Sequence, residues 1–245
     1  MAGITILMYH QIGKFPPMKD HRATYCDINR FKQQMWYLHK FKYNVISLDE
    51  LVNIFQNKKS IPSKTVVLTF DDGYENFLTQ AVPVLSKYNF PAIVYVVPSL
   101  IGKKAEWLAL DGHPTPQMLT LEQLREVRNL GFQVGSHNLV HERMAQKTLK
   151  EQIYEVIESK KILEELLQEE IKHFCYPYGS YNIDSLKAVE AGNYTTAVTC
   201  QRAAATPDFD LLALPRKAIS FGDTLLGFIF KLHAKNLPKS VPLHR

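Results

Sequence analysis

Two acidic residues and two histidines carry the clearest chemical signal in this 245-residue sequence. Asp71 and Asp72 are neighbours in the stretch TFDDGYENF, and His137 and His141 are four residues apart in SHNLVH. One carboxylate and two imidazoles supply three ligands for a divalent metal ion and leave a coordination position open for water, as in catalytic zinc sites. A second carboxylate beside the ligand could accept a proton from that water.

Each of these signals is modest when it stands alone. An Asp-Gly pair after an apolar run is ordinary turn chemistry. The chain has nine histidines, and in roughly a third of such sequences a His pair with this spacing would arise by chance. The functional interpretation therefore depends on whether separate elements of the fold bring these side chains to one place.

Apolar, β-rich runs alternate with amphipathic segments along the whole chain. Predicted strands cover residues 4–9, 44–48, 65–70, 92–97, 132–136, 172–177, 194–199 and 211–220. Predicted helices cover residues 28–41, 49–55, 76–89, 120–131, 148–167, 183–192 and 224–235. This alternation implies right-handed crossovers and a parallel sheet. We expect an α/β fold, a single-domain distorted (β/α) barrel of about seven β/α units, with an open doubly wound sheet as the alternative.

Five predicted strands end in side chains that can do chemistry. His10 follows the first strand, and the aspartate and histidine pairs follow the third and fifth strands. Tyr178 follows the sixth strand, and Arg216 lies late in the last one. The C-terminal ends of parallel strands meet at one face, where α/β folds build their sites. We therefore expect a single catalytic site at that face.

Composition indicates which class of protein carries this site. The chain is 46% hydrophobic and 22% charged, which suits a large core. The net charge is +5 and the basic residues are spread over predicted helices, so we expect no nucleic-acid partner. Residues 4–8 lack the basic start and the cleavage site of a secretion signal, and we interpret them as a strand. With three cysteines and no C-x-x-C pair, we expect a reduced, cytoplasmic protein.

The C-terminal stretch differs from the rest of the chain. We assign residues 1–222 to the catalytic domain and residues 223–245 to an amphipathic helix with a basic tail. Packing of the apolar helix face on the barrel is the main expectation. Weak contact with an anionic inner-membrane surface is the alternative for this segment.

The motifs together resemble the polysaccharide deacetylase family (carbohydrate esterase family 4, the NodB homology domain). The resemblance rests on TFDDGYENF, SHNLVH and FCYPYG in this order, and it extends from LMYHQI to LPRKAIS. It implies that Asp71 is the catalytic base. It also implies that Asp72, His137 and His141 bind one divalent metal ion, zinc in the first place, with cobalt, nickel or manganese as alternatives. Asn138 stands where the family has Ser or Thr, and we expect it to orient the loop.

Two family motifs are altered in this sequence. The usual R-x-P-Y motif reads C-Y-P-Y at 175–178, and the late L-x-H motif is missing, because His233 lies in a helix-like context. Both departures recur in a branch with permuted motif order that resembles the poly-N-acetylglucosamine deacetylases. In that branch a Y-H pair near the N-terminus supplies the general acid. The resemblance therefore implies that His10 is the acid, and Arg216 could replace the missing arginine.

The implied reaction is hydrolysis of the acetamide on an N-acetylated amino sugar or saccharide, which releases acetate and a free amine. The resemblance assigns the backbone N–H of Tyr178 to the oxyanion. We expect the substrate to contact four aromatic side chains, those of Tyr9, Tyr74, Tyr176 and Trp107. The alternatives are a related metal-dependent amidohydrolase acting on a non-sugar amide, an inactive carbohydrate-binding module, and a structural protein at a membrane surface.

Overall fold

The computed structural model describes residues 3–17, 20–111, 113–234, 236–238 and 242–244. Its strands are β1 (Thr5–Tyr9), β2 (Gln11–Gly13), β3 (Tyr25–Asp27), β4 (Asn44–Val45), β5 (Thr65–Phe70), β6 (Ile93–Val96), β7 (Gln133–Ser136), β8 (His173–Cys175), β9 (Thr196–Val198) and β10 (Lys217–Ala218). Its α-helices are α1 (Ile28–Lys40), α2 (Leu48–Gln56), α3 (Val82–Lys87), α4 (Leu121–Asn129), α5 (Leu149–Leu167), α6 (Ile183–Ala191) and α7 (Leu225–His233).

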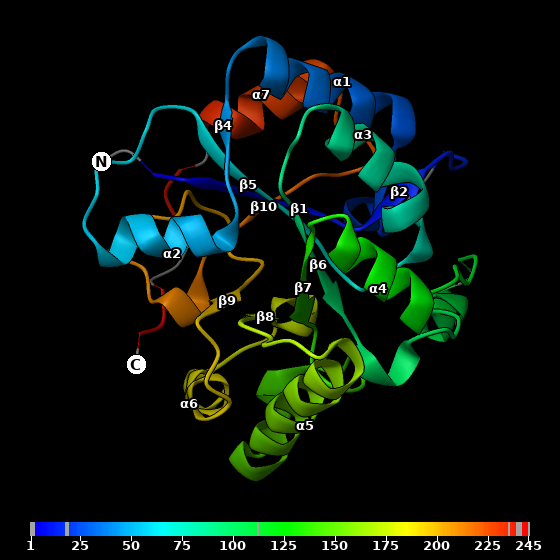
Figure 1. The fold of residues 1–245 in the computed structure, drawn as a ribbon, viewed down its shortest axis with the longest axis vertical. Helices are drawn as coiled ribbons and strands as arrows, with labels where there is room; N and C mark the ends of the chain where they lie inside the picture. The colour runs from blue at the N-terminus through cyan, green and yellow to red at the C-terminus, as the bar shows by residue number, and fades with distance from the viewer. Residues whose placement is uncertain (1–2, 18–19, 112, 235, 239–241, 245) are drawn as a thin grey trace.

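Within the described residues, one eight-stranded parallel sheet forms the centre of the molecule (Figure 1). Its order is β10-β1-β5-β6-β7-β8-β9, and β4 pairs with the first part of β5, on the edge that β6 uses further along. Val198 at the end of β9 forms a parallel bridge with Leu214, which lies just before β10. The sheet therefore curls back on itself, and the expected single-domain distorted (β/α) barrel is confirmed.

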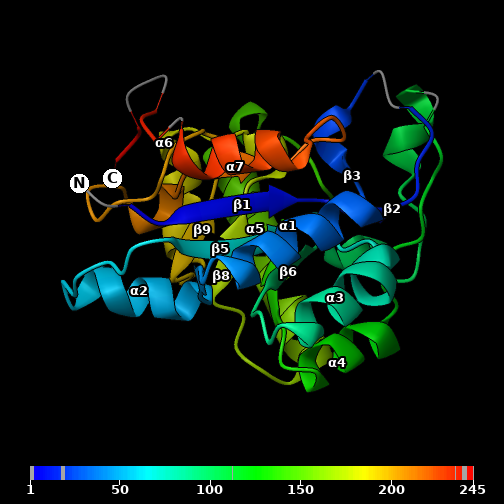
Figure 2. The same ribbon diagram turned by 90° about the horizontal axis from the view of Figure 1, so that it is seen from above.

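Burial explains why these runs are strands in a barrel. Every residue of β1, β5 and β6 is buried, as expected for parallel strands that are covered on both faces. Helices supply the outer cover, and α1 and α7, which pack against each other, lie on the same side of β1 (Figures 1 and 2). The side chain of Asp27 caps α1 by accepting hydrogen bonds from the amides of Asn29 and Arg30, which fixes where this helix begins.

The inner face of α7 belongs to the main hydrophobic core. Phe228 and Leu232 are buried there. The ammonium group of Lys217 in β10 donates hydrogen bonds to the carbonyl oxygens of Lys231 (2.8 Å) and Ala234 (2.9 Å) at the C-terminal end of the helix. A cation at this end also interacts favourably with the helix dipole. The apolar face of the C-terminal helix thus packs on the barrel, as expected.

The outer face of α7 exposes Leu226 and Phe230. None of the helices in the described part of the chain combines the length and apolarity needed to cross a membrane. Residues 235, 239–241 and 245 of the basic tail lie outside the described residues. Contact of this segment with a membrane surface stays a prediction.

Two predicted elements take a different form in the structure. The helix predicted over residues 76–89 is divided into a π-helical turn, Phe77–Ala81, and α3, with Pro83 in the first turn of α3. The amide of Val82 donates to the carbonyl oxygen of Phe77, five residues back, and Pro83, which has no N–H to donate, follows this π-type turn. The strand predicted over residues 211–220 is too long, because a 3₁₀ turn precedes the two-residue β10. Pro215 between them has no N–H to donate to a strand ladder.

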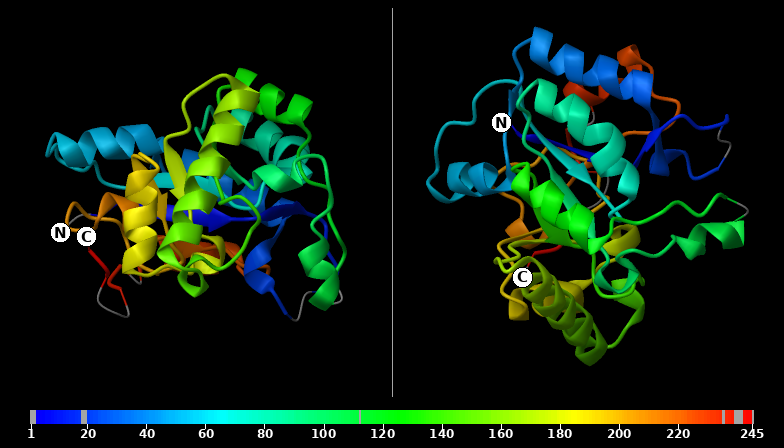
Figure 3. Two further views of the ribbon diagram at one scale, coloured as in Figure 1. Left: turned by 90° about the horizontal axis from the view of Figure 1, so that it is seen from below. Right: turned by 45° about the vertical axis from the view of Figure 1, so that its right-hand side comes forward.

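Two long connections project beyond the C-terminal ends of the strands. β1 points toward β2 and β3, which pair in parallel, and the 3₁₀ segment Glu106–Asp111 lies on the same side (Figures 2 and 3). The rings of Tyr25 and His113 are in contact, with centroids 5.9 Å apart. The two connections therefore meet beside the face where the site is expected.

Candidate active site

Neighbouring strands deliver polar side chains to a cavity of about 600 Å³ at the predicted face. β1 and β5 pair in parallel, and the amide of Asp71 donates a hydrogen bond to the carbonyl oxygen of Tyr9 (2.9 Å). The residues that follow these two strands are therefore adjacent. The cavity lining includes seven predicted site residues: His10, Asp71, Asp72, Trp107, His137, His141 and Tyr178.

Three metal-ligand atoms converge in this cavity. The Nε2 atoms of His137 and His141 lie 3.1 and 3.2 Å from Oδ1 of Asp72. Nδ1 of His137 is 2.8 Å from the carbonyl oxygen of Cys175. A carbonyl can only accept, so Nδ1 carries a proton, and Nε2 is the nitrogen that faces the carboxylate. One carboxylate oxygen and two imidazole nitrogens that converge in this way are a ligand set for a divalent metal ion, and these side chains therefore fit such an ion.

The electrostatics of Asp72 agree with this fit. Burial by itself raises the pKa of the Asp72 carboxyl, but the two imidazoles outweigh burial and lower the pKa well below its ordinary value. The carboxylate is therefore ionised, as a metal ligand must be.

Asn138 shapes the loop that carries the two histidines. Its Oδ1 accepts hydrogen bonds from the amides of Val140 (3.1 Å) and His141 (2.7 Å), and its Nδ2 donates to the carbonyl oxygen of Glu142. Asn138 and His141 both have positive φ angles, 55° and 62°. Asparagine is among the residues that best tolerate this conformation. The side chain thus orients the loop, as predicted for the position where Ser or Thr is usual.

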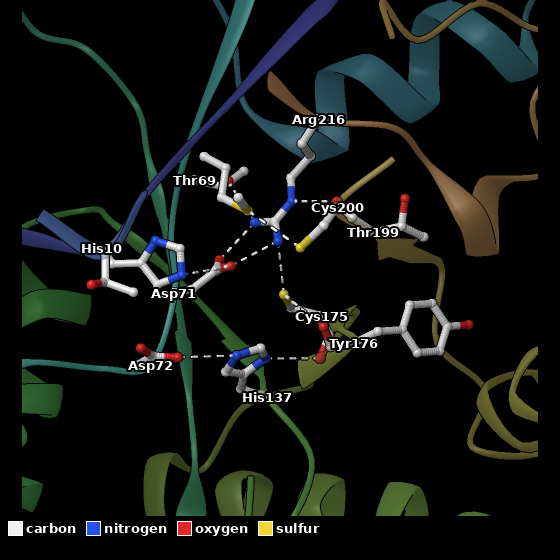
Figure 4. A network of polar contacts seen from close by, with 12 residues as sticks. His10, Thr69, Asp71, Asp72, His137, Cys175, Tyr176, Thr199, Cys200 and Arg216 are labelled. Atoms are coloured by element: carbon white, nitrogen blue, oxygen red, sulfur yellow. Dashed lines mark hydrogen bonds and ion pairs between the residues drawn. The ribbon is translucent and has the colours of Figure 1, made fainter. Parts of the chain in front are cut away.

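Arg216 is fully buried and binds Asp71 with both ends of its guanidinium group. Nη1 and Nη2 donate to Oδ1 and Oδ2 of Asp71 at 2.6 and 2.7 Å (Figure 4). Nε donates to the carbonyl oxygen of Thr199, and further contacts reach Thr69 and Cys175. This bidentate contact gives Arg216 the geometry expected for a substitute of the missing motif arginine.

The pair sets the charge state of Asp71. Burial raises the pKa of the Asp71 carboxyl, whereas the charge and the hydrogen bonds of Arg216 lower it, and the net effect is a lowered pKa. Asp71 is therefore ionised near neutral pH and is able to accept a proton.

His10 faces the same carboxylate from β1. Its Nε2 lies 3.8 Å from Oδ2 of Asp71, and the ring lines the cavity (Figure 4). His233 has a different environment. His233 is the last residue of α7, and its Nε2 lies 2.9 Å from the hydroxyl of Tyr43. His233 is not among the residues that line the cavity.

Four aromatic side chains were predicted to contact the substrate. Three of them do not line the cavity, and the prediction is wrong for these three. Tyr9 and Tyr176 are core residues, whose hydroxyls donate to Gln34 Oε1 (2.8 Å) and to the carbonyl oxygen of Leu212 (3.0 Å). Tyr74 is 1% exposed and packs in a small hydrophobic cluster with Ala105, Leu108 and Met118. Side chains alternate along an extended chain, so His10 and the preceding Tyr9 point in opposite directions.

Replacing Tyr176 by phenylalanine is expected to reduce stability without changing substrate binding. The substitution leaves the buried carbonyl oxygen of Leu212 without its donor, which costs about 1–3 kcal/mol. Urea unfolding and steady-state kinetics measure the two effects. The same substitution at the exposed Tyr154 is the control and should change neither quantity. An increased KM with unchanged stability would instead indicate that Tyr176 contacts the substrate.

Loop residues complete the cavity and were not predicted. The lining also contains His21, Thr24, Leu108, Glu142, Arg143 and Cys200. Most of these follow no strand directly, and their types carry no spacing signal. Only the folded arrangement of the connections brings them to the site.

Comparisons with known proteins agree with this site. Residues 58–197 match the family model for polysaccharide deacetylases. The Bacillus subtilis protein YxkH, whose name refers to the same activity, is 30% identical over 221 residues, which are 90% of this chain and 73% of YxkH. The poly-beta-1,6-N-acetyl-D-glucosamine N-deacetylase of Staphylococcus epidermidis is 25% identical over 233 residues, which are 87% of this chain and 78% of that protein.

Solved structures show the same fold. The Streptococcus pyogenes deacetylase PplD, determined in complex with acetate, aligns with a TM-score of 0.82 and 27% identity over 95% of this chain and 99% of PplD. IcaB from Ammonifex degensii aligns with a TM-score of 0.80 and 22% identity over 95% of this chain and 97% of IcaB. With the predicted motifs gathered at one face of this barrel, the chain belongs to the polysaccharide deacetylase family.

Proposed function

We propose that the protein is a metal-dependent N-deacetylase that hydrolyses the acetamide of an N-acetylglucosamine saccharide. The observation that carries this proposal is the arrangement around Asp71 and Asp72. One carboxylate meets two imidazole nitrogens, and its neighbour meets a guanidinium group and a third imidazole. A metal-binding group and an acid–base pair thus occupy one cavity, as amide hydrolysis requires.

Each side chain of the site has a separate role in the hydrolysis. A divalent metal ion held by Asp72, His137 and His141 would polarise the amide carbonyl and activate a water molecule. Asp71 accepts a proton from the attacking water, and its pairing with Arg216 keeps it ionised for this role.

The leaving group and the oxyanion are stabilised by other parts of the cavity. His10 protonates the leaving nitrogen, which would otherwise depart as a strongly basic amide anion. The backbone N–H of Tyr178 stabilises the oxyanion. Zinc is the first choice for the ion, because one carboxylate and two imidazoles suit it, with cobalt, nickel and manganese as alternatives.

The substrate class is supported by the relatives. The Staphylococcus epidermidis protein is named for poly-beta-1,6-N-acetyl-D-glucosamine, and PplD binds acetate, which is the expected product. The cavity volume of about 600 Å³ is in the usual range for small-molecule sites and leaves room for a sugar residue.

An acetate-release assay tests the proposal. The purified protein, with its metal content determined, is incubated with defined N-acetylglucosamine oligosaccharides, with acetylated amines and with peptidoglycan fragments. We expect acetate from a saccharide, loss of activity with a chelator, and recovery on adding zinc. Release only from acetylated amines would favour the non-sugar amidohydrolase. Saccharide binding without acetate release from any substrate would favour the inactive binding module.

Replacing Arg216 by methionine is expected to move the acidic limb of the activity profile to higher pH. Burial of Asp71 would no longer be offset by the guanidinium, so the pKa of its carboxyl would rise and a smaller fraction would be ionised at neutral pH. Measuring kcat/KM between pH 5 and 9 checks the shift.

Arg216→Lys is the control for this substitution, because it keeps a positive charge beside Asp71. Breaking a buried pair costs about 3–5 kcal/mol, so the fold of both variants is verified by circular dichroism. An acidic limb that stays in place in a folded Arg216→Met variant would show that Arg216 does not tune the base.

A further inference from the structure

Aromatic rings surround the metal-ligand candidate His141. The Trp107 ring centroid lies 4.6 Å from the His141 centroid, at an interplanar angle of 35°. The Tyr178 ring lies 4.7 Å from it, at 44°. The guanidinium carbon of Arg143 in turn lies 4.3 Å from the Tyr178 centroid. We call Trp107, His141, Tyr178 and Arg143 the His141 cluster.

The two histidines of the metal group are held in different ways. Nδ1 of His137 is hydrogen-bonded to the carbonyl oxygen of Cys175, which fixes the tautomer and the direction of the ring. Nδ1 of His141 is buried and has no hydrogen-bond partner among the described residues. A metal-binding histidine almost always has such a partner for its second nitrogen. The ring of His141 therefore depends on packing for its orientation.

Trp107 packs on a small hydrophobic cluster that is separate from the main core. Tyr74, Ala105, Leu108 and Met118 are buried together, and Trp107 packs against them. The Tyr74 and Trp107 rings are 6.4 Å apart. Backbone hydrogen bonds from Ala105 to Pro116 and from Met118 to Lys103 close the loop that carries the tryptophan. The indole is thus presented to His141 by a packed segment.

We propose that Trp107 is a positioning residue for the metal ligand His141. Contact between the two rings restricts rotation of the imidazole about its Cβ–Cγ bond and keeps Nε2 directed at Oδ1 of Asp72, 3.2 Å away. Tyr178 and Arg143, the other members of the His141 cluster, restrict the imidazole ring further. Packing thereby does for His141 what a hydrogen bond does for His137.

This inference rests on the proposed metal site and predicts the strength of metal binding. Loss of a group that orients a metal ligand typically lowers metal affinity about 10–100-fold. Removing the indole should therefore weaken zinc binding by about that factor. Part of the indole also packs on the small hydrophobic cluster, so the stability of each metal-free variant is measured separately from its zinc affinity.

Zinc affinity measured by competition with a chromophoric chelator tests the inference, on the full-length metal-free protein. The variants are Trp107→Leu, which keeps apolar volume without a planar ring, and Trp107→Phe, which restores a ring. Trp36→Leu is the matched control, because Trp36 is an exposed tryptophan of α1. Thermal unfolding of each metal-free variant verifies that it is folded.

We expect zinc affinity to fall about 10–100-fold in Trp107→Leu, to be largely restored in Trp107→Phe, and to be unchanged in Trp36→Leu. Equal affinity of Trp107→Leu and the wild type would overturn the inference, and so would a Trp107→Phe variant as weak as Trp107→Leu. Absence of zinc binding by the wild type would instead contradict the proposed metal site. The two failures are therefore distinguishable.

Discussion

Replacing Asp71 by asparagine is expected to lower kcat by about 10²–10⁴-fold while the protein keeps its metal ion. The amide has nearly the shape of the carboxylate but cannot accept the proton of the attacking water. The metal-ligand candidates Asp72, His137 and His141 are not altered by this change. Acetate release and metal content, measured on the same preparation, check the two halves of the prediction.

Asp72→Asn is the matched control, because the same chemical change is made at the neighbouring position. It should lower the metal content, since the ionised Oδ1 faces both imidazole nitrogens. Asp71→Asn also loses part of its pairing with Arg216, so folding is verified first. Near-normal turnover in a folded Asp71→Asn variant would mean that another group is the base.

Replacing His10 by alanine is expected to lower kcat by about 10²-fold or more, with metal content and fold retained. His10 lines the cavity 3.8 Å from Asp71, but it is not one of the converging metal-ligand atoms. An acid that protonates the leaving nitrogen acts after the attack of water. The loss should therefore appear in the chemical step and not in metal binding.

His233→Ala is the control for this prediction. His233 contacts Tyr43 at the end of α7 and is not part of the cavity lining, so its removal should change kcat little. An inactive His233→Ala variant together with an active His10→Ala variant would contradict the permuted order of motifs.

The sequence by itself determined the architecture and the chemical centre of this protein. Buried β-rich runs such as residues 65–70 are local signals, and their alternation with amphipathic segments leaves few topologies other than a parallel, helix-covered sheet. Once strands are parallel, whatever follows them meets at one face. For that reason the amino-acid sequence alone was enough to place Asp71, Asp72, His137 and His141 in one site.

Only the tertiary structure decided which other side chains reach that site. Arg216 comes within 2.6 Å of Asp71 although 145 residues separate them, and this contact depends on how the barrel closes between β9 and β10. Tyr176 has a suitable type and position for substrate binding, yet core packing takes its side chain away from the cavity. Trp107 reaches His141 because a loop folds on its own small cluster. Such contacts depend on packing between distant segments, which local sequence patterns do not encode.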